Sequence, residues 1–559
     1  MKRLVTPKFL LIALLAVYLL AVLPFVDRHP IVEIAQVSIA APAAKLLSEG
    51  VYGNDLYRGF YRTEEVNFEY MPLYSLLLAG SFRLLGLGLV QARLVSILAG
   101  MAVLLLTYAL GRKLADEWTG LLAAAALVLL PISIPQHGQG SLYPSAFPLI
   151  DLARVIRFDV LVPVFTLAAL LVLVRPGRRI TPSVAFLSGM LAGFATLTHL
   201  YGAFMLPVLF VLLLYREGWQ SLRKPGPYML VAGWVLALLP WIIYAGTNWL
   251  DYRGQMLRHS GRFDLFDPYF YLGNLLGEPW RYLRIFGAFR QPILFPRPAF
   301  WLVLAGLVIG SVLAAGRLRR HKDFRLLALF LPLPMLALEM GLLLNFKRYA
   351  YLAPLLPHAA LLFAFGWQEL WRWTRDKAPI YRWLIAGIFA AALLEGGIAL
   401  FNNFQDARTT STVADVVREI GPQVRPEERT VMLHAYWFEL TSLDTYALDL
   451  AFVLAQPEIT GNPNQGMAEA LALISPDNII VREELLKTYE RDPTTSANAK
   501  VMGLWRAFDE YVQAHCSLKY QTPADRDYGT ILLYTCEKPG AGRRSLILGP
   551  LADARLPPR

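Results

Sequence analysis

The chain has 559 residues, of which 56% are apolar and only 17% are charged, and its mean hydropathy is +0.43. A soluble protein carries roughly a quarter charged residues, so this composition excludes a soluble enzyme, a disordered scaffold and a disulfide-stapled secreted module. Residues 1–403 have a net charge of +16, and residues 404–559 have a net charge of −5. We therefore expect a multi-pass membrane domain over 1–403 and a soluble domain over 404–559. The basic excess indicates cytoplasmic loops and not a nucleic-acid surface.

Apolar runs predict the membrane helices. Residues 9–26 follow a basic segment and contain no small-residue cleavage site, which predicts an uncleaved first span with a cytoplasmic N-terminus. Residues 72–85 are too short to span and contain Arg83, so we expect an interfacial helix on the outer face. Ten further spans are predicted at 91–111, 118–135, 159–174, 183–199, 201–215, 228–246, 298–315, 325–344, 349–366 and 383–402.

This topology places Lys and Arg in every predicted cytoplasmic turn. Three long segments, 27–90, 136–158 and 247–297, then share the outer face. The odd number of spans also puts the C-terminal domain outside. We expect a plasma or inner membrane location, with the polar chemistry on the extracytoplasmic side.

The C-terminal segment reads as a small α/β domain. Strands are predicted at 430–434 and 478–481, a helix at 497–514, and a hairpin from 516–520 and 530–536. Centred near Asp525 and Arg526, that hairpin sets Cys516 opposite Cys536, the only cysteines in the chain. An oxidising compartment favours a disulfide between them, and two free thiols are the alternative. The domain has no catalytic motif and is expected to be a cap or a docking surface.

Acidic residues mark the first outer loop. Glu33 lies about seven residues beyond the first span and precedes a helical-looking segment, 34–49. A carboxylate there is suited to act as a general base on an acceptor hydroxyl or amine. Asp27 is closer to the span and competes for this role, and a solvated loop charge is the plain alternative. Glu69 and Tyr70 end the loop just before the interfacial helix.

The second outer loop ends in Arg154, Arg157 and Asp159, directly before a span. On a helix, Arg154 and Arg157 would share a face, and two guanidinium groups there suit a phosphate. An Arg–Asp salt bridge that ends the helix is the alternative. An unpaired Asp159 at the membrane boundary would be costly.

Two further basic features lie near the outer leaflet. His199 sits at the predicted turn between two spans, and Lys347 and Arg348 form a basic outer turn against the positive-inside trend. Anion binding explains such a pair, and contact with lipid headgroups is the alternative.

The sequence has no phosphate-binding loop, zinc signature or nucleophile elbow. An activated sugar donor would therefore be lipid-linked and reached from outside. The metal requirement stays open, although carboxylates could hold Mg²⁺ or Mn²⁺.

Together these features resemble the C-type (GT-C) glycosyltransferase superfamily, and most closely its protein O-mannosyltransferase and lipid A aminoarabinose transferase branch. The likeness spans about residues 1–370. Its motifs are Glu33, AKLLSEG at 44–50, EYMPL at 69–73, Arg83 to Gly86, ARL at 92–94, LGRK at 110–113, ARVIRFD at 153–159, Gly189 to His199, and Arg348 to Pro357.

The resemblance implies a GT-C fold with outer juxtamembrane helices and a polyprenyl-phosphate or polyprenyl-diphosphate sugar donor. Glu33 would activate the acceptor and Asp159 would be the second acidic position. Arg154, Arg157 and Arg348 would be the candidates for the lipid phosphate. The chain departs from the family where Glu33 stands alone instead of in an acidic pair. The spacing from Glu33 to Gly50 is also about two residues longer than the family's, which keeps Asp27 as a candidate. It also departs at His199, where several relatives carry Lys.

The resulting hypothesis is a membrane glycosyltransferase that acts on an extracytoplasmic protein, lipid or glycan. The first alternative is an inactive GT-C-fold subunit of a larger membrane assembly. A transporter is the second alternative, and it would predict inverted repeats and acidic residues at mid-membrane.

Overall fold

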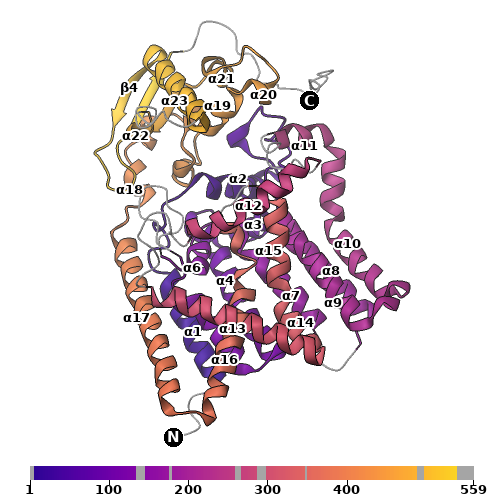
Figure 1. The fold of residues 1–559 in the computed structure, drawn as a ribbon. Coiled ribbons are helices and arrows are strands. Elements are labelled where there is room, and N and C mark those ends of the chain that lie inside the picture. Colours follow the sequence, from indigo (N-terminus) through magenta and orange to yellow (C-terminus); the bar gives the residue numbers. More distant parts are fainter. Residues whose placement is uncertain are drawn as a thin grey trace.

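The computed structural model describes residues 6–133, 145–174, 179–257, 266–285, 297–345, 349–486 and 496–537. A bundle of long helices makes up most of the chain, and a small sheet domain lies against one end of it (Figure 1). The start of α1 lies at the opposite end, and so does the turn between α16 and α17 (Figure 1).

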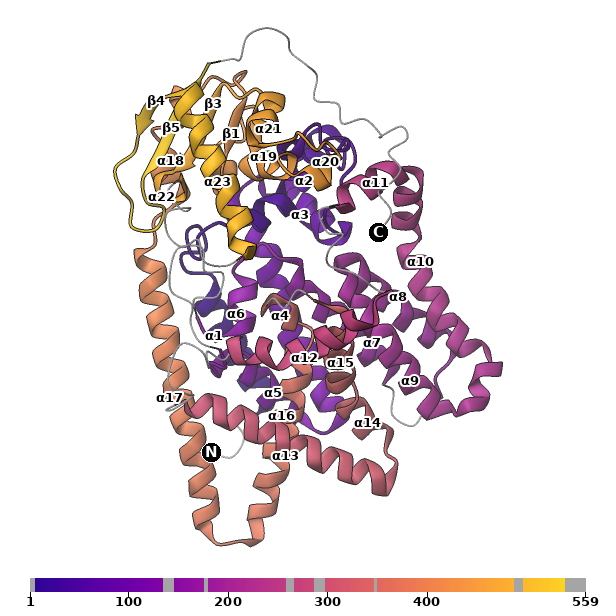
Figure 2. The same ribbon diagram turned by 45° about the horizontal axis from the view of Figure 1, so that its top comes forward.

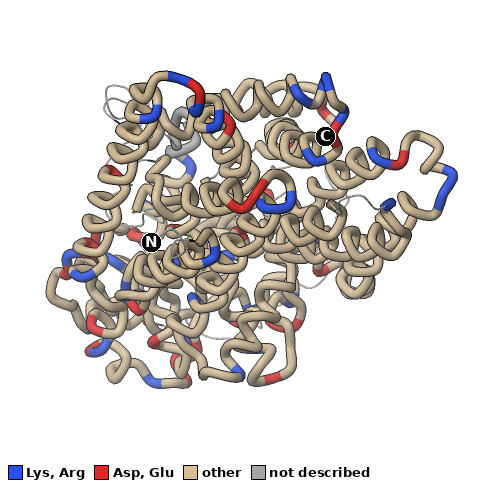
Figure 3. The backbone as a smooth tube through the Cα atoms, turned by 90° about the horizontal axis from the view of Figure 1, so that it is seen from below, with Lys and Arg blue, Asp and Glu red and all other residues tan. Residues whose placement is uncertain are grey.

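Every predicted span contains helix. The bundle helices are α1 (Pro7–Val22), α4 (Leu89–Leu114), α5 (Glu117–Leu129), α7 (Leu161–Leu173), α8 (Pro182–Thr198), α9 (Met205–Glu217), α10 (Pro225–Thr247), α13 (Pro298–His321), α14 (Phe324–Phe330), α15 (Pro332–Leu343), α16 (Leu356–Trp373) and α17 (Pro379–Thr409). Within the described chain, six helical stretches are long and apolar enough to cross a membrane. Charged residues gather near the helix ends when the bundle is viewed from the N-terminal end (Figure 3).

Local sequence explains where these helices break. His199 adopts an extended backbone (φ −159°, ψ 144°) and ends α8, and the 3-10 turn η3 (Leu200–Phe204) leads into α9. Pro332 opens α15 directly after α14. Where α8 packs on α10, a Cβ at Gly189 would lie 1.8 Å from the Leu230 carbonyl oxygen. Only glycine permits that close contact between helices.

Shorter helices separate the bundle from the sheet domain. α2 (Ile34–Glu49) and α3 (Pro72–Leu85) lie at the sheet-domain end of the bundle in both ribbon views (Figures 1 and 2). α6 (Pro148–Ala153) and the 3-10 turn η2 (Phe158–Val160) lead into α7. α11 (Trp249–Met256) and α12 (Pro268–Ile285) belong to the third long loop.

The sheet domain (residues 411–486 and 496–537) contains five strands in the order β2-β1-β3-β5-β4. β1 (Thr430–Met432) pairs in parallel with β2 (Thr445–Ala447) and β3 (Asn478–Arg482). β5 (Ile531–Cys536) runs antiparallel to β3 and to β4 (Cys516–Gln521). The principal helix of the domain is α23 (Ser496–His515), and the smaller helices are α18 (Val413–Val417), α19 (Leu448–Leu454), α20 (Pro457–Thr460), α21 (Met467–Ile474) and α22 (Glu483–Leu486).

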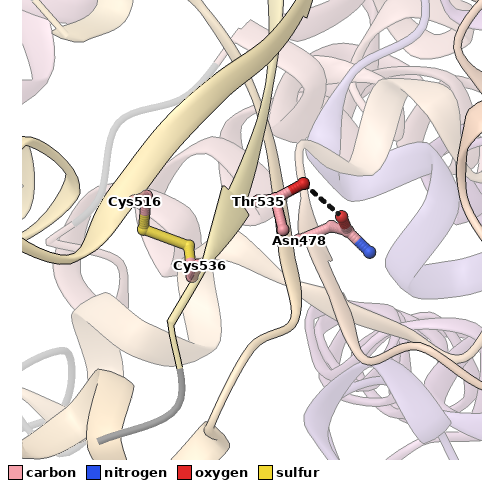
Figure 4. The surroundings of a disulfide bond; sticks show 4 residues. All are labelled: Asn478, Cys516, Thr535 and Cys536. Carbon is pink, nitrogen blue, oxygen red and sulfur yellow. Dashed lines mark hydrogen bonds between the residues drawn. A yellow bond between two sulfur atoms is a disulfide. The ribbon is translucent and has the colours of Figure 1, made fainter.

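The predicted strands, helix and hairpin all form, and β2 is an addition. Cys516 faces Cys536 in the β4–β5 register, and their sulfurs are bonded (Figure 4). On the next strand pair, the Thr535 hydroxyl donates to the Asn478 side chain at 3.4 Å (Figure 4).

Polar contacts dock the sheet domain onto the first long loop. The Tyr57 hydroxyl donates to Asp449 Oδ2 at 3.1 Å and lies 3.1 Å from His434 Nε2. Arg58 donates to Asp444 Oδ1 at 2.9 Å. Tyr57 and His434 are buried, so these contacts fix the position of the domain above α2 and α3.

Candidate active site

Loop 26–33 carries the two candidate bases and is anchored by Arg93, near the start of α4. Arg93 is fully buried. It donates to the carbonyl oxygens of Val26 at 2.8 Å and Pro30 at 2.6 Å, and to Gln36 Oε1 at 3.3 Å. A guanidinium that satisfies several backbone carbonyls holds a loop in one shape. The shape of loop 26–33 is thus set from the bundle.

The two acids differ in their surroundings. Asp27 accepts two hydrogen bonds from Arg28, at 3.2 and 3.0 Å. Glu33 is half-buried and occupies the N-cap position of α2 with an extended backbone. The partial positive charge at a helix N-terminus favours an ionised carboxylate there.

Asp159 is the centre of a second group of residues, the aromatic cluster (Tyr70, Arg157, Phe158, Asp159, His199, Tyr201 and Tyr351). Arg157 Nε donates to Asp159 Oδ2 at 2.7 Å, and the Tyr201 hydroxyl donates to Asp159 Oδ1. Asp159 is fully buried. Both carboxylate oxygens are therefore engaged, one by a cation and one by a phenol.

Aromatic rings surround this ion pair. Phe158 stacks on His199 with 4.7 Å between ring centroids, and Tyr70 lies 5.5 Å from Phe158. Tyr351 lies 5.6 Å from His199 and 5.4 Å from Tyr201. The predicted residues Tyr70, Arg157, Asp159 and His199 thus come together from three distant parts of the chain.

The aromatic cluster and loop 26–33 are joined through α2 and α4. Gln36 Oε1, which accepts from Arg93, also accepts from the Ile156 amide at 3.2 Å. Ser96 Oγ accepts from the Arg157 amide at 3.4 Å. Arg93 and Ser96 are three residues apart on α4, a rise of about 4.5 Å. One helical turn of α4 therefore connects the two groups.

The expectation that Arg154 and Arg157 share a helix face is wrong. α6 ends at Ala153, Arg154 is its C-cap, and Arg157 has an extended backbone. The amides of residues 156 and 157 bond to Gln36 and Ser96, in place of carbonyl groups one turn back. The two arginines part as a result: Arg154 donates to the Pro24 carbonyl at 3.0 Å, and Arg157 binds Asp159.

Arg154 belongs to a buried electrostatic group with Asp151 and His29. Burial raises the pKa of Asp151 to about 7. The hydrogen bonds from Ser145 and the positive charge of Arg154 act in the opposite direction and only partly offset this rise. Burial also lowers the pKa of Arg154 to about 10, although the negative charge of Asp151 acts to raise it. Burial and the positive charges of Arg154 and Arg93 lower the pKa of His29 to about 3. His29 is consequently neutral at physiological pH, 3.1 Å from Thr410 Oγ1.

Glu69 and Tyr70 are neighbours in the sequence but lie in different surroundings. Tyr70 belongs to the aromatic cluster, whereas Glu69 lies near the buried Tyr52 phenol. Burial raises the pKa of Tyr52 to about 12, and nearby Ser75 and Asn67 oppose the shift. Lys347 and Arg348 lie outside the described residues.

The sequence leaves a divalent cation as a possibility, and the described residues supply no ligand set for one. Among them, no three His, Cys, Asp or Glu side chains are grouped to hold a metal ion. Asp159 is already bound on both oxygens, and Asp27 is paired with Arg28. The carboxylates of the described residues therefore do not fit a metal site.

Sequence reasoning missed Arg93, Gln36, Tyr201 and Tyr351. Arg93 stands inside the quoted ARL motif, and a charged residue near the start of an apolar span was its available signal. Tyr201 follows His199 by two residues. Tyr351 stands inside the Arg348 to Pro357 motif, but its role depends on ring contacts with His199 and Tyr201.

Searches by sequence find no matching protein-family model and no significant match among curated proteins. Solved structures do match. ArnT from Cupriavidus metallidurans bound to undecaprenyl phosphate superposes with a TM-score of 0.56 at 14% identity, over 94% of this chain and 97% of that chain. ArnT is a lipid A aminoarabinose transferase.

The oligosaccharyltransferase AglB from Archaeoglobus fulgidus, in complex with an inhibitory peptide and a dolichol-phosphate, matches with a TM-score of 0.55. Its identity is 11%, over 94% of this chain and 74% of that chain. A Zn and sulfate complex of the same oligosaccharyltransferase has a TM-score of 0.54 at 12% identity, over 93% of this chain and 72% of that chain.

The chain has the GT-C fold. This confirms the predicted membrane helix bundle with a C-terminal sheet domain. Loop 26–33 leads directly into α2, and Tyr70 of the aromatic cluster lies just before α3. Both helices lie at the sheet-domain end of the bundle (Figure 2).

Proposed function

We propose that this protein is an integral membrane glycosyltransferase that uses a polyprenyl-phosphate or polyprenyl-diphosphate sugar donor. The observation that carries the proposal is the fold shared with ArnT over 94% of the chain. That ArnT structure holds undecaprenyl phosphate, and the AglB structure holds a dolichol-phosphate. The linked loop 26–33 and aromatic cluster give this chain a candidate site for the same class of donor.

The proposed reaction takes place on the extracytoplasmic face of the plasma or inner membrane. The first helix follows a basic N-terminal segment in the sequence, and the sheet domain, α2 and α3 lie at the far end of the bundle from the start of α1 (Figure 1). The positive-inside rule then favours an outer location for the site. The acceptor is an extracytoplasmic protein, lipid or glycan.

The chemistry is a displacement at the anomeric carbon. An acceptor oxygen or nitrogen forms a bond to C1 of the sugar, and the bond from C1 to the phosphate oxygen breaks. The polyprenyl phosphate or diphosphate leaves with the electron pair of the broken bond on its phosphate oxygen, and the acceptor proton passes to Glu33. We favour Glu33 over Asp27 because Glu33 is half-buried and stands at the N-cap of α2, which follows loop 26–33 directly.

Asp159 acts through its neighbours in this proposal. Its two oxygens hold Arg157 and Tyr201, so its task is to fix a positive charge and a phenol beside the donor. Arg157 and His199, with Tyr70, form the proposed donor pocket, and Lys347 and Arg348 remain predicted phosphate contacts. Arg154 faces Pro24 and Asp151 and is assigned a structural role.

The test is transfer of label from a panel of radiolabelled polyprenyl-phosphate sugars by the purified full-length protein. We expect turnover by the wild type and its loss in Glu33→Gln. The matched control is Glu49→Gln, which makes the same change at the other end of α2 and should leave turnover unchanged. An inactive wild type with co-purifying partner proteins would favour the subunit alternative.

A further inference from the structure

The hairpin between β4 and β5 has an ordered tip that reaches the bundle. Asp525 and Gly529 pair with each other, and Asp525 Oδ1 accepts from the amides of Asp527 and Tyr528 at 2.8 Å each. Gly529 has a positive φ of 65°, which only glycine adopts without strain. The tip therefore has a fixed shape that directs Tyr528.

Hydrogen bonds tie this tip to the end of α17. The Ser411 hydroxyl donates to Asp525 Oδ2 at 2.6 Å, and the Ser411 amide donates to Asp527 Oδ2 at 2.9 Å. The neighbouring Thr410 hydroxyl lies 3.1 Å from His29 Nδ1, within loop 26–33. The hairpin tip and loop 26–33 thus share one support at the end of α17.

Tyr528 is the hairpin residue that approaches loop 26–33 itself. Its side chain is only 2% exposed, and its hydroxyl lies near the Val32 amide and the positive charge of Arg93. It makes no hydrogen bond of ordinary geometry to a described protein atom. A buried hydroxyl without a partner costs free energy, and the Val32 amide is the donor beside the Tyr528 hydroxyl.

Val32 directly precedes Glu33. Arg93 holds the same loop through the carbonyl oxygens of Val26 and Pro30. We propose that Tyr528 is a positioning residue for Glu33, so that the sheet domain is part of the active site and not only a cap over it. This inference rests on the proposed function, in which Glu33 is the base.

The test compares Tyr528→Phe with Tyr520→Phe in the purified full-length protein. Tyr520 lies on β4 of the same hairpin, and its hydroxyl contacts Glu419 at the surface. Both substitutions remove one hydroxyl and keep the ring. We expect Tyr528→Phe to lower kcat about tenfold with the donor KM within about twofold, the pattern of a lost transition-state interaction. Tyr520→Phe should match the wild type.

A second readout does not depend on activity. Glu33→Cys adds a free thiol to a chain whose own cysteines are bonded to each other. We expect Tyr528→Phe to change the rate of maleimide labelling at this thiol at least about threefold, and Tyr520→Phe to leave it unchanged. Unchanged labelling, or a kcat loss that only follows the loss of folded protein, would overturn the inference. Changed labelling with no turnover by the wild type would uphold the placement of Glu33 and reject the proposed function alone.

Discussion

Arg157 Nε donates to Asp159 Oδ2 at 2.7 Å, and neither side chain is more than 3% exposed. A buried ion pair of this kind adds little net stability by itself, but removing one partner leaves the other charge uncompensated. The Tyr201 hydroxyl occupies the second carboxylate oxygen, so Asp159 holds two parts of the site at once.

Asp159→Asn should therefore lower the free energy of unfolding by about 3–5 kcal/mol, because Arg157 keeps its charge and loses its counter-ion. Thermal unfolding in detergent measures the loss. Asp376→Asn is the control, since Asp376 is an exposed residue at the turn that leads into α17. A change of less than about 1 kcal/mol in Asp159→Asn would contradict the buried pair.

His199 offers a test of donor binding that leaves packing largely intact. His199→Phe keeps an aromatic ring on Phe158 and removes the polar nitrogens. We expect the donor KM to rise about tenfold, because one anion contact is lost. Thermal stability should fall only slightly, because His199 Nδ1 also accepts a long hydrogen bond from the Tyr201 amide at 3.4 Å. His199→Lys should restore tight donor binding by supplying a fixed charge. Equal donor KM in all three proteins would remove His199 from the donor pocket.

Much of the fold could be predicted because its signals are local. Gly50 ends α2, Pro72 opens α3, and the predicted bounds of both helices, 34–49 and 72–85, match the structure. The cysteine register followed from hairpin symmetry. β2 was missed because its three residues run directly into α19 and form no separate apolar run.

The site was harder to predict because its contacts are long-range. The Arg154–Arg157 segment looked helical, yet its amides bond to Gln36 and Ser96, which are 120 and 61 residues away. Tyr201 and Tyr351 acquire a role only when α8, η3 and η6 (Tyr349–Leu352) meet. Residue type marked Asp159 and His199 as candidates, but only the fold supplied their partners.

Asp151 predicts an unusual dependence of stability on pH. Its pKa is raised from 3.8 to about 7 on folding, so the folded protein binds this proton between those values and the unfolded chain releases it. The resulting stabilisation is complete below about pH 3.8 and is lost as pH rises through 7. Asp151→Asn keeps a neutral side chain at every pH. The stability of the wild type relative to this variant should fall by about 1.4 kcal/mol per pH unit between pH 4 and 7. Chemical unfolding at stepped pH values checks the slope, and parallel curves for the two proteins would refute it.

The disulfide predicts how the sheet domain responds to reduction. Cys516 and Cys536 close a loop with a sequence separation of 20, and releasing a loop of this size costs about 3 kcal/mol of stability. The double variant Cys516→Ser/Cys536→Ser should lose its sheet domain to protease at a lower temperature than the wild type, while the bundle helices stay intact. Reductant should bring the wild type to the level of the variant and leave the variant unchanged.

The β4–β5 hairpin places Tyr528 beside Val32. Reduction and the double substitution should therefore also lower transfer activity before the bundle unfolds. Full activity in the reduced protein would show that the hairpin tip keeps its place without the bond.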